Sequence, residues 1–204
     1  MRIISRMETG GALIVCLLLI ISGCASPHSR FYTLNVGKSL GNVRPSTGYR
    51  LLVALGPVQI PDYLDRPQIV IRTGRNELTF SEFDRWAGSL KDNIAQVLSE
   101  DLTRLLSRNG VSVSPWEWGA ASDYRVSVDI RRFDIMTDGY VLLDCQWSII
   151  GKDGIKILLT RQSSAKESVS APTYPARISS MSKALKKVSR DIAAGIKAVS
   201  GANR

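Results

Sequence analysis

One cysteine in this sequence lies in a setting that indicates a definite chemistry, the acylation of its thiol. Cys24 ends the string Ile21-Ser22-Gly23-Cys24, which matches the lipobox of bacterial lipoprotein signals. Arg2 and Arg6 precede an uninterrupted apolar run over residues 12–21, as in the positive and apolar regions of an export signal. As a helix this run would span only about 15 Å, which is too short to cross a bilayer. We predict that a diacylglycerol is attached to Cys24 and that the chain is cleaved before it.

The other cysteines and the histidine offer little further chemistry. Cys16 lies within the predicted signal, so Cys145 is the remaining free thiol of an exported chain. Strand alternation places Cys145 on the same face as Leu143 and Trp147, which predicts a buried, inert thiol rather than a reactive one. The single histidine, His28, follows the acylation site closely, so no zinc site of the His and Cys type is expected, whereas a carboxylate site stays open. We expect no metal and no cofactor.

Two Ser-x-x-Lys strings, Ser163 to Lys166 and Ser180 to Lys183, have the spacing of the nucleophile motif of penicillin-binding enzymes. Neither Ser-Asp-Asn nor Lys-Thr-Gly accompanies them, so we interpret both matches as accidental. A group of nearby charges is interpreted as ion pairs in a loop region: Asp62, Asp65, Arg66, Glu82, Asp84 and Arg85. The chain is therefore predicted not to be an enzyme.

The predicted mature chain is strongly basic. The whole sequence has a formal net charge of +9, and the signal contributes two Arg and one Glu, so residues 24–204 keep +8. An exported, acylated protein does not meet nucleic acid, and we predict no such partner. Its acidic partners are instead anionic phospholipid head groups, lipopolysaccharide or acidic protein surfaces. A solvated surface rich in Lys and Arg explains the same charge without any specific partner.

Hydrophobic periodicity predicts an α+β domain whose first half mixes strands with one helix. Strands are predicted at residues 31–36, 49–60, 68–72 and 77–80, with a bulge or an edge position at Gly56-Pro57. Residues 73–76 read as a hairpin loop. An apolar helix face then runs from Trp86 to Leu106, and Gly110 is its stop signal.

The second half is predicted to be a meander followed by a helix. Three long strands are expected at residues 123–135, 139–150 and 155–169, and Asp-Gly at both turns favours antiparallel pairing. The last helix has one apolar stripe, formed by Ile178, Met181, Leu185, Val188, Ile192, Ile196 and Val199. We predict an antiparallel sheet, made of the meander and the N-terminal strands and covered by two amphipathic helices. A final helix that lies on a membrane surface is the alternative.

Several of these motifs occur together in one known family. A string from Gly56 to Val70 contains Pro-Asp-Tyr-Leu-Asp-Arg-Pro, and Arg85-Trp86-Ala87 opens the predicted helix. With the lipobox, the early Phe31-Tyr32-Thr33-Leu34 strand and the final helix, the mature chain resembles the ABC-type transport auxiliary lipoproteins of the PqiC/YmbA type. The resemblance implies an outer-membrane lipoprotein without catalysis of its own. Such proteins work with mammalian-cell-entry (MCE) proteins and inner-membrane ABC or integral membrane transporter components in moving lipids across the periplasm.

The proline-rich part of that string is the predicted docking element. It consists of Pro61, Asp62, Tyr63, Leu64, Asp65, Arg66 and Pro67. The two prolines fix their own φ and restrict the residues before them, so the connection should be stiff. Tyr63 and Leu64 are candidates for an exposed anchor that binds a partner. The alternative is that both fold inward as a plug over the sheet.

These expectations define the organisation and the function. Residues 1–23 form the signal peptide, 24–30 the acylated N-terminus and tether, and 31–204 a single periplasmic domain. Ala25 rather than Asp after the acylated cysteine favours the outer membrane, held through acyl chains such as palmitate. We predict a non-catalytic, outer-membrane-anchored subunit of an intermembrane lipid transport system that docks an MCE-type partner. Whether several copies form a homo-oligomeric ring is an open question at this point. The rival hypothesis is an envelope assembly factor or chaperone for an outer-membrane barrel or lipopolysaccharide.

Overall fold

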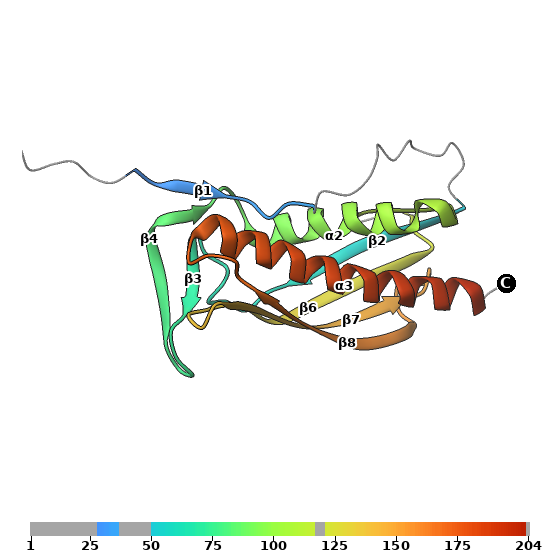
Figure 1. Cartoon of the computed structure of the whole chain (residues 1–204). Helices are drawn as coiled ribbons and strands as arrows, with labels where there is room; N and C mark the ends of the chain where they lie inside the picture. Colours follow the sequence, from blue (N-terminus) through green and yellow to red (C-terminus); the bar gives the residue numbers. More distant parts are fainter. Residues whose placement is uncertain (1–27, 37–49, 117–120, 203–204) are drawn as a thin grey trace, which may run out of the picture.

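The protein is built from two layers, a mixed β-sheet and a pair of helices that cover one of its faces (Figure 1). The computed structural model describes residues 28–36, 50–116 and 121–202. Within these ranges no helix is long and apolar enough to cross a membrane. Cys24 and the predicted signal lie outside the described residues. The α+β class predicted from the sequence is confirmed.

A three-stranded meander forms the largest part of the sheet. Strands β6 (Tyr124–Met136), β7 (Tyr140–Ile150) and β8 (Ile157–Ser168) pair antiparallel in chain order, as the Asp-Gly turns predicted. Along β7 buried and half-buried residues alternate strictly, because successive side chains point to opposite faces of the sheet. The buried set faces the helices and includes Trp147 and Cys145. The predicted meander is therefore confirmed.

Strand β6 is the centre of the sheet, and two shorter strands share its other edge. Strand β2 (Leu51–Gln59) pairs parallel with its first half and with β5 (Val111–Pro115), a strand that the sequence analysis did not predict. The register of β2 against β6 shifts between Leu55 and Val58. Gly56 lies in this bulge with φ +140, a conformation that L side chains rarely adopt. The bulge predicted from Gly-Pro is thus confirmed.

The remaining strands extend the sheet past the end of β6. Strand β3 (Gln68–Arg72) pairs parallel with the last residues of β6 and antiparallel with β4 (Leu78–Trp86), and this confirms the predicted hairpin. Strand β1 (Arg30–Tyr32) pairs parallel with the end of β4. Among the described residues four ladders are parallel, beside the three antiparallel ladders that contain most of the paired residues.

Helix α2 (Leu90–Leu106) packs on β2 and β5. It begins later than predicted, because Ser89 caps it by accepting a hydrogen bond from the backbone N–H of Asp92. Trp86 is therefore the last residue of β4, and its assignment to the helix face was wrong, although the side chain is buried as expected for core. A short 3-10 turn, Ser107–Asn109, ends the helix at the predicted Gly110.

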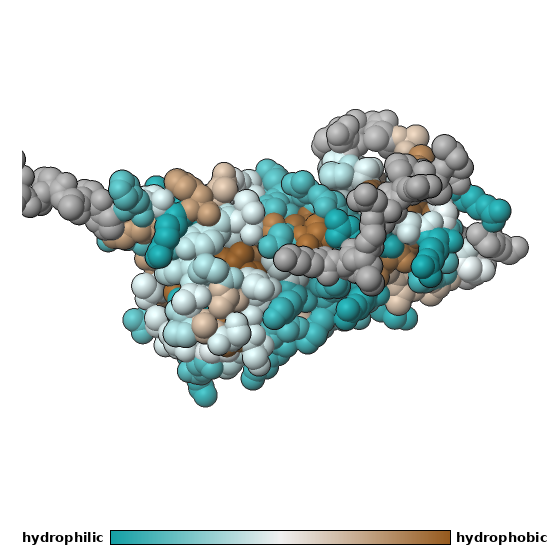
Figure 2. Space-filling view, turned by 45° about the horizontal axis from the view of Figure 1, so that its top comes forward, coloured by the Kyte–Doolittle hydropathy of each residue, from teal (hydrophilic) through white to brown (hydrophobic). Residues whose placement is uncertain are grey.

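Helix α3 (Tyr174–Ala202) covers β7 and β8 and also contacts α2. Its predicted apolar stripe is buried from Ile178 to Ile196, so this stripe packs on the sheet as predicted. Figure 2 shows, on the side of the molecule that carries the helices, hydrophobic residues in small areas separated by hydrophilic ones. At Gly195 the backbone approaches the Trp147 ring so closely that an added Cβ would lie 2.5 Å from Cη2. The helix can reach this depth only with glycine at that position.

The opposite face of the meander is polar and carries no helix. Its side chains come from the outward positions of β6, β7 and β8, among them Arg125, Asp129, Asp144, Gln146 and Gln162. These residues are half-buried or exposed, whereas their inward neighbours are buried. The sheet therefore has one core face and one solvated face.

Candidate functional site

The segment that leads from the predicted anchor into the domain is held by a buried carboxylate. Arg30 forms an ion pair with Asp84, with 2.9 Å between Nε and Oδ1, and the Tyr32 hydroxyl donates to the same carboxylate over 2.9 Å. Ser81 donates to it as well. Burial by itself raises the pKa of Asp84, but the three hydrogen bonds outweigh it and lower the pKa below its ordinary value. The charge on Asp84 thus binds β1 to β4.

The next residues of this segment are tied to both helices. The side chain of Asn93 on α2 accepts from the backbone N–H of Leu34 over 2.7 Å and donates to the carbonyl of the same residue over 3.3 Å. Leu34 itself is buried. The backbone N–H of Asn35 donates to Ser182 Oγ on α3. Residues 30–35 are therefore joined to the sheet and to both helices.

The predicted docking segment, residues 61–67, connects β2 to β3 at the same end of the molecule as β1 (Figure 1). Leu64 is buried at 3% exposure and Tyr63 is half-buried, so these two candidates for an exposed anchor point inward. The Arg66 guanidinium lies 4.0 Å from the centroid of the Phe80 ring. The exposed members are Asp62, Asp65 and Pro67. The accessible side of the segment is therefore acidic rather than aromatic.

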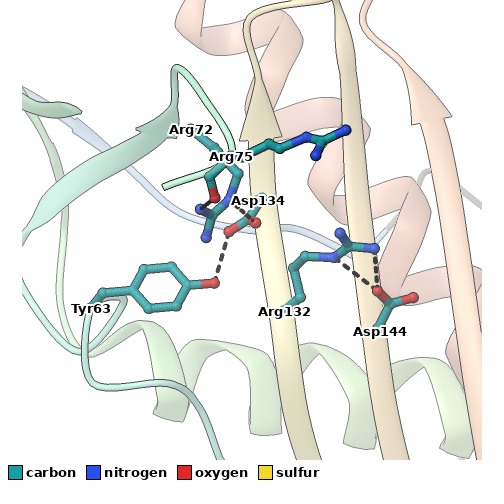
Figure 3. Close-up of polar contacts among 6 residues, drawn as sticks. All are labelled: Tyr63, Arg72, Arg75, Arg132, Asp134 and Asp144. Carbon is teal, nitrogen blue, oxygen red and sulfur yellow. Dashed lines mark hydrogen bonds and ion pairs between the residues drawn. The ribbon is translucent and has the colours of Figure 1, made fainter. Parts of the chain in front are cut away.

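A hydrogen-bond network fixes this segment to the centre of the sheet (Figure 3). The Tyr63 hydroxyl donates to Oδ1 of Asp134 over 2.8 Å, and Arg72 Nε donates to Oδ2 of the same side chain. Asp134 is almost completely buried, and these two partners satisfy both of its oxygens. Burial, followed by the hydrogen bond to Asp134, raises the pKa of Tyr63 to about 12. The phenol is therefore held protonated as a structural donor.

The two Ser-x-x-Lys strings do not form serine–lysine pairs. Ser163 is buried and donates to Asp191 Oδ2 over 2.7 Å, whereas Lys166, three residues along the same strand, lies on the opposite face with its amine over the Tyr140 ring. Ser180 is buried and donates to the carbonyl of Ser168. Both hydroxyls therefore have structural partners in place of a catalytic lysine.

The predicted ion pairs of the loop region are only partly observed. Asp84 is paired, but its partner is Arg30 instead of Arg66 or Arg85. The guanidinium of Arg85 donates to the carbonyl of Glu82. Sequence proximity indicated the wrong partners here, because the correct one is 54 residues away along the chain.

The other candidates for chemistry are the free thiol of Cys145, groups of metal-binding side chains and one further serine motif. Cys145 is buried, and burial raises the pKa of its thiol to about 12, in agreement with the predicted inert thiol. Among the described residues no three His, Cys, Asp or Glu side chains are grouped as a metal site. The string Gly37-Lys38-Ser39-Leu40-Gly41, which the sequence reasoning missed, has the spacing of a hydrolase nucleophile elbow but lies outside the described residues.

These features define a small α+β domain whose N-terminal residues 30–35 are held to the sheet and to both helices. Comparison with known proteins identifies its class. Residues 32–193 match the family described as ABC-type transport auxiliary lipoprotein component, and the chain belongs to this family. A family of transport auxiliary lipoproteins implies a role without catalysis.

The chain is also similar to individual proteins, one in sequence and two in fold. The chain is similar to the intermembrane transport lipoprotein PqiC of Escherichia coli (strain K12), with 28% identity over 137 residues, which are 66% of this chain and 71% of the relative. A solved protein of Xanthomonas campestris shares the fold with a TM-score of 0.66 and 17% identity, covering 86% of this chain and 98% of that one. An uncharacterized solved protein has a TM-score of 0.69 and 19% identity, covering 83% and 99%.

Proposed function

We propose that this protein is a non-catalytic, outer-membrane-anchored lipoprotein subunit of an intermembrane lipid transport system, in which it docks an MCE-domain partner. The observation that carries the proposal is the family match, which extends over residues 32–193 and so includes nearly the whole domain. The similarity to an intermembrane transport lipoprotein over 66% of the chain supports the same system. Its partners would be the MCE-domain protein and, through it, inner-membrane transporter components.

The clamp on the N-terminal segment supports the anchoring part of the proposal. Arg30 is only six residues after Cys24, and a chain of that length reaches at most about 20 Å. With Arg30 fixed to Asp84, an acyl group on Cys24 would keep this end of the domain near the membrane surface. Replacing Cys24 by Ala should abolish acylation and signal cleavage, which is measured by metabolic labelling with a radioactive fatty acid. Normal processing and membrane retention of that variant would contradict the anchor.

The docking part concerns the exposed side of residues 61–67. Since Tyr63 and Leu64 contact the fold, the residues available to a partner are Asp62, Asp65 and Pro67. Carboxylates on a stiff loop would guide a basic surface of the partner into register. We therefore expect the partner's contact surface to be basic.

Affinity capture tests the proposed partner. The acylated protein is purified from its own membranes under mild detergent, and co-purifying proteins are identified by mass spectrometry. We expect an MCE-domain protein, with recovery reduced severalfold by the double change Asp62→Lys and Asp65→Lys. Asp129→Lys is the matched control, because it reverses an exposed charge on the polar face of β6. The molecular mass of the captured complex also reports whether the protein forms a homo-oligomeric ring.

Two outcomes would each refute a different part of the proposal. Recovery of an outer-membrane barrel without an MCE protein would favour the assembly-factor hypothesis and remove the transport role. Equal recovery with the Asp62/Asp65 variant and with wild type would leave the transport role but exclude the acidic side of residues 61–67 as the contact.

A further inference from the structure

A basic pocket lies between two loops at the end of the sheet. One wall is the loop that joins β3 to β4, with Arg72 and Arg75, and the other is the turn that joins β6 to β7. The floor includes Arg132 and Tyr140, and the volume is about 610 Å³. Among the described residues the lining includes the carboxylate of Asp138, on the turn, and Glu77 lies beside Gly74 of the opposite loop. Three arginines therefore line a single pocket.

The cations of this pocket differ in how far they are neutralised. Arg72 donates to buried Asp134, and Arg132 donates to Asp144 on the neighbouring strand (Figure 3). These two arginines are thereby fixed in place. Among the described residues Arg75 has no carboxylate partner, and in Figure 3 its side chain extends across β6 with a free guanidinium group. An unpaired arginine beside two fixed ones is a suitable arrangement for a second, external anion.

A further cation lies next to the pocket. The Lys166 amine lies 4.0 Å from the centroid of the Tyr140 ring, which lines the pocket, and the lysine side chain is exposed. No ion pair is formed by this amine within the described part of the chain. Together with Arg75 it supplies two cations that form no ion pair within the described residues, beside the carboxylate of Asp138 in the lining. An anionic ligand would therefore meet cations that are not already held in an ion pair.

The pocket lies at the end of the molecule where the tether leaves. Strand β4 links the two places, because it begins at Leu78 beside the pocket loop and reaches β1 at Asp84 (Figure 1). Six residues of extended strand correspond to about 20 Å. This separation is about the same as the reach of the six residues from Cys24 to Arg30, so a membrane surface that holds Cys24 would lie within range of the pocket.

We propose that the pocket of Arg72, Arg75 and Arg132 binds the phosphate of an anionic glycerophospholipid head group in the membrane that anchors the protein. This inference rests on the membrane attachment in the proposed function but not on the partner. The ligand chemistry follows from the donors: planar guanidinium groups bind phosphate oxygens in pairs, and the rim charges favour a head group with net negative charge over a zwitterionic one. An acidic peptide offers carboxylates to the same donors, but the acyl anchor would hold the pocket near lipid head groups and not near a particular peptide.

Photocrosslinking on the full acylated chain tests the site. The photoreactive residue p-benzoylphenylalanine replaces Thr73, which lines the pocket, or Arg190, which is exposed on α3. Each protein is reconstituted in phosphatidylcholine vesicles that contain a minor fraction of ³²P-labelled phosphatidylglycerol. We expect a labelled adduct from position 73 and little from position 190. In the position-73 background, Arg75→Gln should reduce the adduct about fivefold, the effect of one basic residue near an anionic lipid surface, whereas Arg161→Gln, an exposed arginine on β8, should not.

Each other result overturns the proposal in a stated way. Equal labelling from positions 73 and 190, or no effect of Arg75→Gln, would show only general contact with the membrane. Equal adduct yield when the label is on phosphatidylcholine would exclude selectivity for an anionic head group. Loss of the adduct on addition of excess inorganic phosphate at constant ionic strength would identify a free phosphate site, and the same loss with a polyglutamate peptide would identify an acidic peptide site. A failed crosslink with intact MCE recovery refutes the pocket alone, and the reverse refutes the partner alone.

Discussion

Replacing Gly195 by Ala should destabilise the protein, although alanine is normally the better helix residue. The new Cβ would lie 2.5 Å from Cη2 and 2.8 Å from Cζ3 of Trp147, and 3.2 Å from Leu159. Trp147 cannot withdraw freely, because it is 1% exposed and its Nε1 donates to Ser163, which in turn donates to Asp191. Overpacking a core in this way costs about 1–3 kcal/mol.

The expected net effect follows from two opposing terms. Alanine recovers about 1 kcal/mol of helix propensity over glycine, so we expect the free energy of unfolding to fall by about 0–2 kcal/mol. For a domain of this size each kcal/mol lowers the melting temperature by about 2–4 °C. Urea unfolding followed by tryptophan fluorescence, together with thermal unfolding by circular dichroism, measures both quantities.

Gly201→Ala is the matched control, since Gly201 lies in the same helix with nothing within 4 Å of an added Cβ. This variant should be neutral or slightly stabilising. In a Trp147→Phe background the smaller ring lacks the clashing atoms, so Gly195→Ala should cost less than in the wild type. If Gly195→Ala stabilises the protein as much as Gly201→Ala does, the close packing of α3 on Trp147 is wrong.

Three further predictions concern buried ionisable groups. The pKa of Asp84 is lowered in the fold, so the ionised carboxylate stabilises the protein fully above the ordinary pKa of 3.8. This stabilisation is lost as the pH falls through the lowered pKa of the folded state. Asp84→Asn should remove this acid dependence of stability and increase amide hydrogen exchange in residues 30–35. Burial raises the pKa of Asp101, whose Oδ2 lacks a hydrogen-bond partner. The fold therefore favours the protonated carboxyl group, and this contribution to stability is lost as the pH rises from 3.8 through the raised pKa. Asp101→Asn should therefore leave stability at pH 7 unchanged or higher, and a clear loss in thermal unfolding at that pH would contradict the argument. Cys145, with its pKa raised to about 12, should resist a maleimide in the native protein and react fully in urea; rapid native labelling would show that the site opens.

Sequence patterns predicted the secondary structure well where residues close together in the sequence decide it. The Asp-Gly turns of the meander, the bulge at Gly56 and the apolar stripe of α3 all occur where the sequence indicated them. Strand β5 was not predicted, because five residues after a helix stop carry too weak a pattern to be distinguished from a loop. Trp86 was assigned to the helix because its spacing matches the apolar face of α2, and only the Ser89 cap separates the two elements.

The candidate sites were harder to predict than the elements. The Pro61 to Pro67 segment was recognised from its composition, but the inward direction of Tyr63 depends on Asp134, which is 71 residues away. The partner of Arg30 is similarly remote, and nothing in the local sequence identifies Asp84 as the residue that holds the tether. The basic pocket joins a hairpin loop to a turn more than 50 residues later, so its arginines appear in the sequence only as scattered charges.

The sequence by itself determined the features that depend on near neighbours along the chain: the lipobox that predicts acylation at Cys24, the periods of the strands and helices, the basic charge and the family signature. The tertiary structure decided which residues meet. Parallel ladders, such as β1 with β4 and β2 with β6, join strands that are far apart in the sequence, and their pairing is set by how the whole sheet buries its apolar face. For that reason the hydrogen bonds of Asp84 to β1, the acidic exposed side of residues 61–67 and the arginine pocket became visible only in the folded chain.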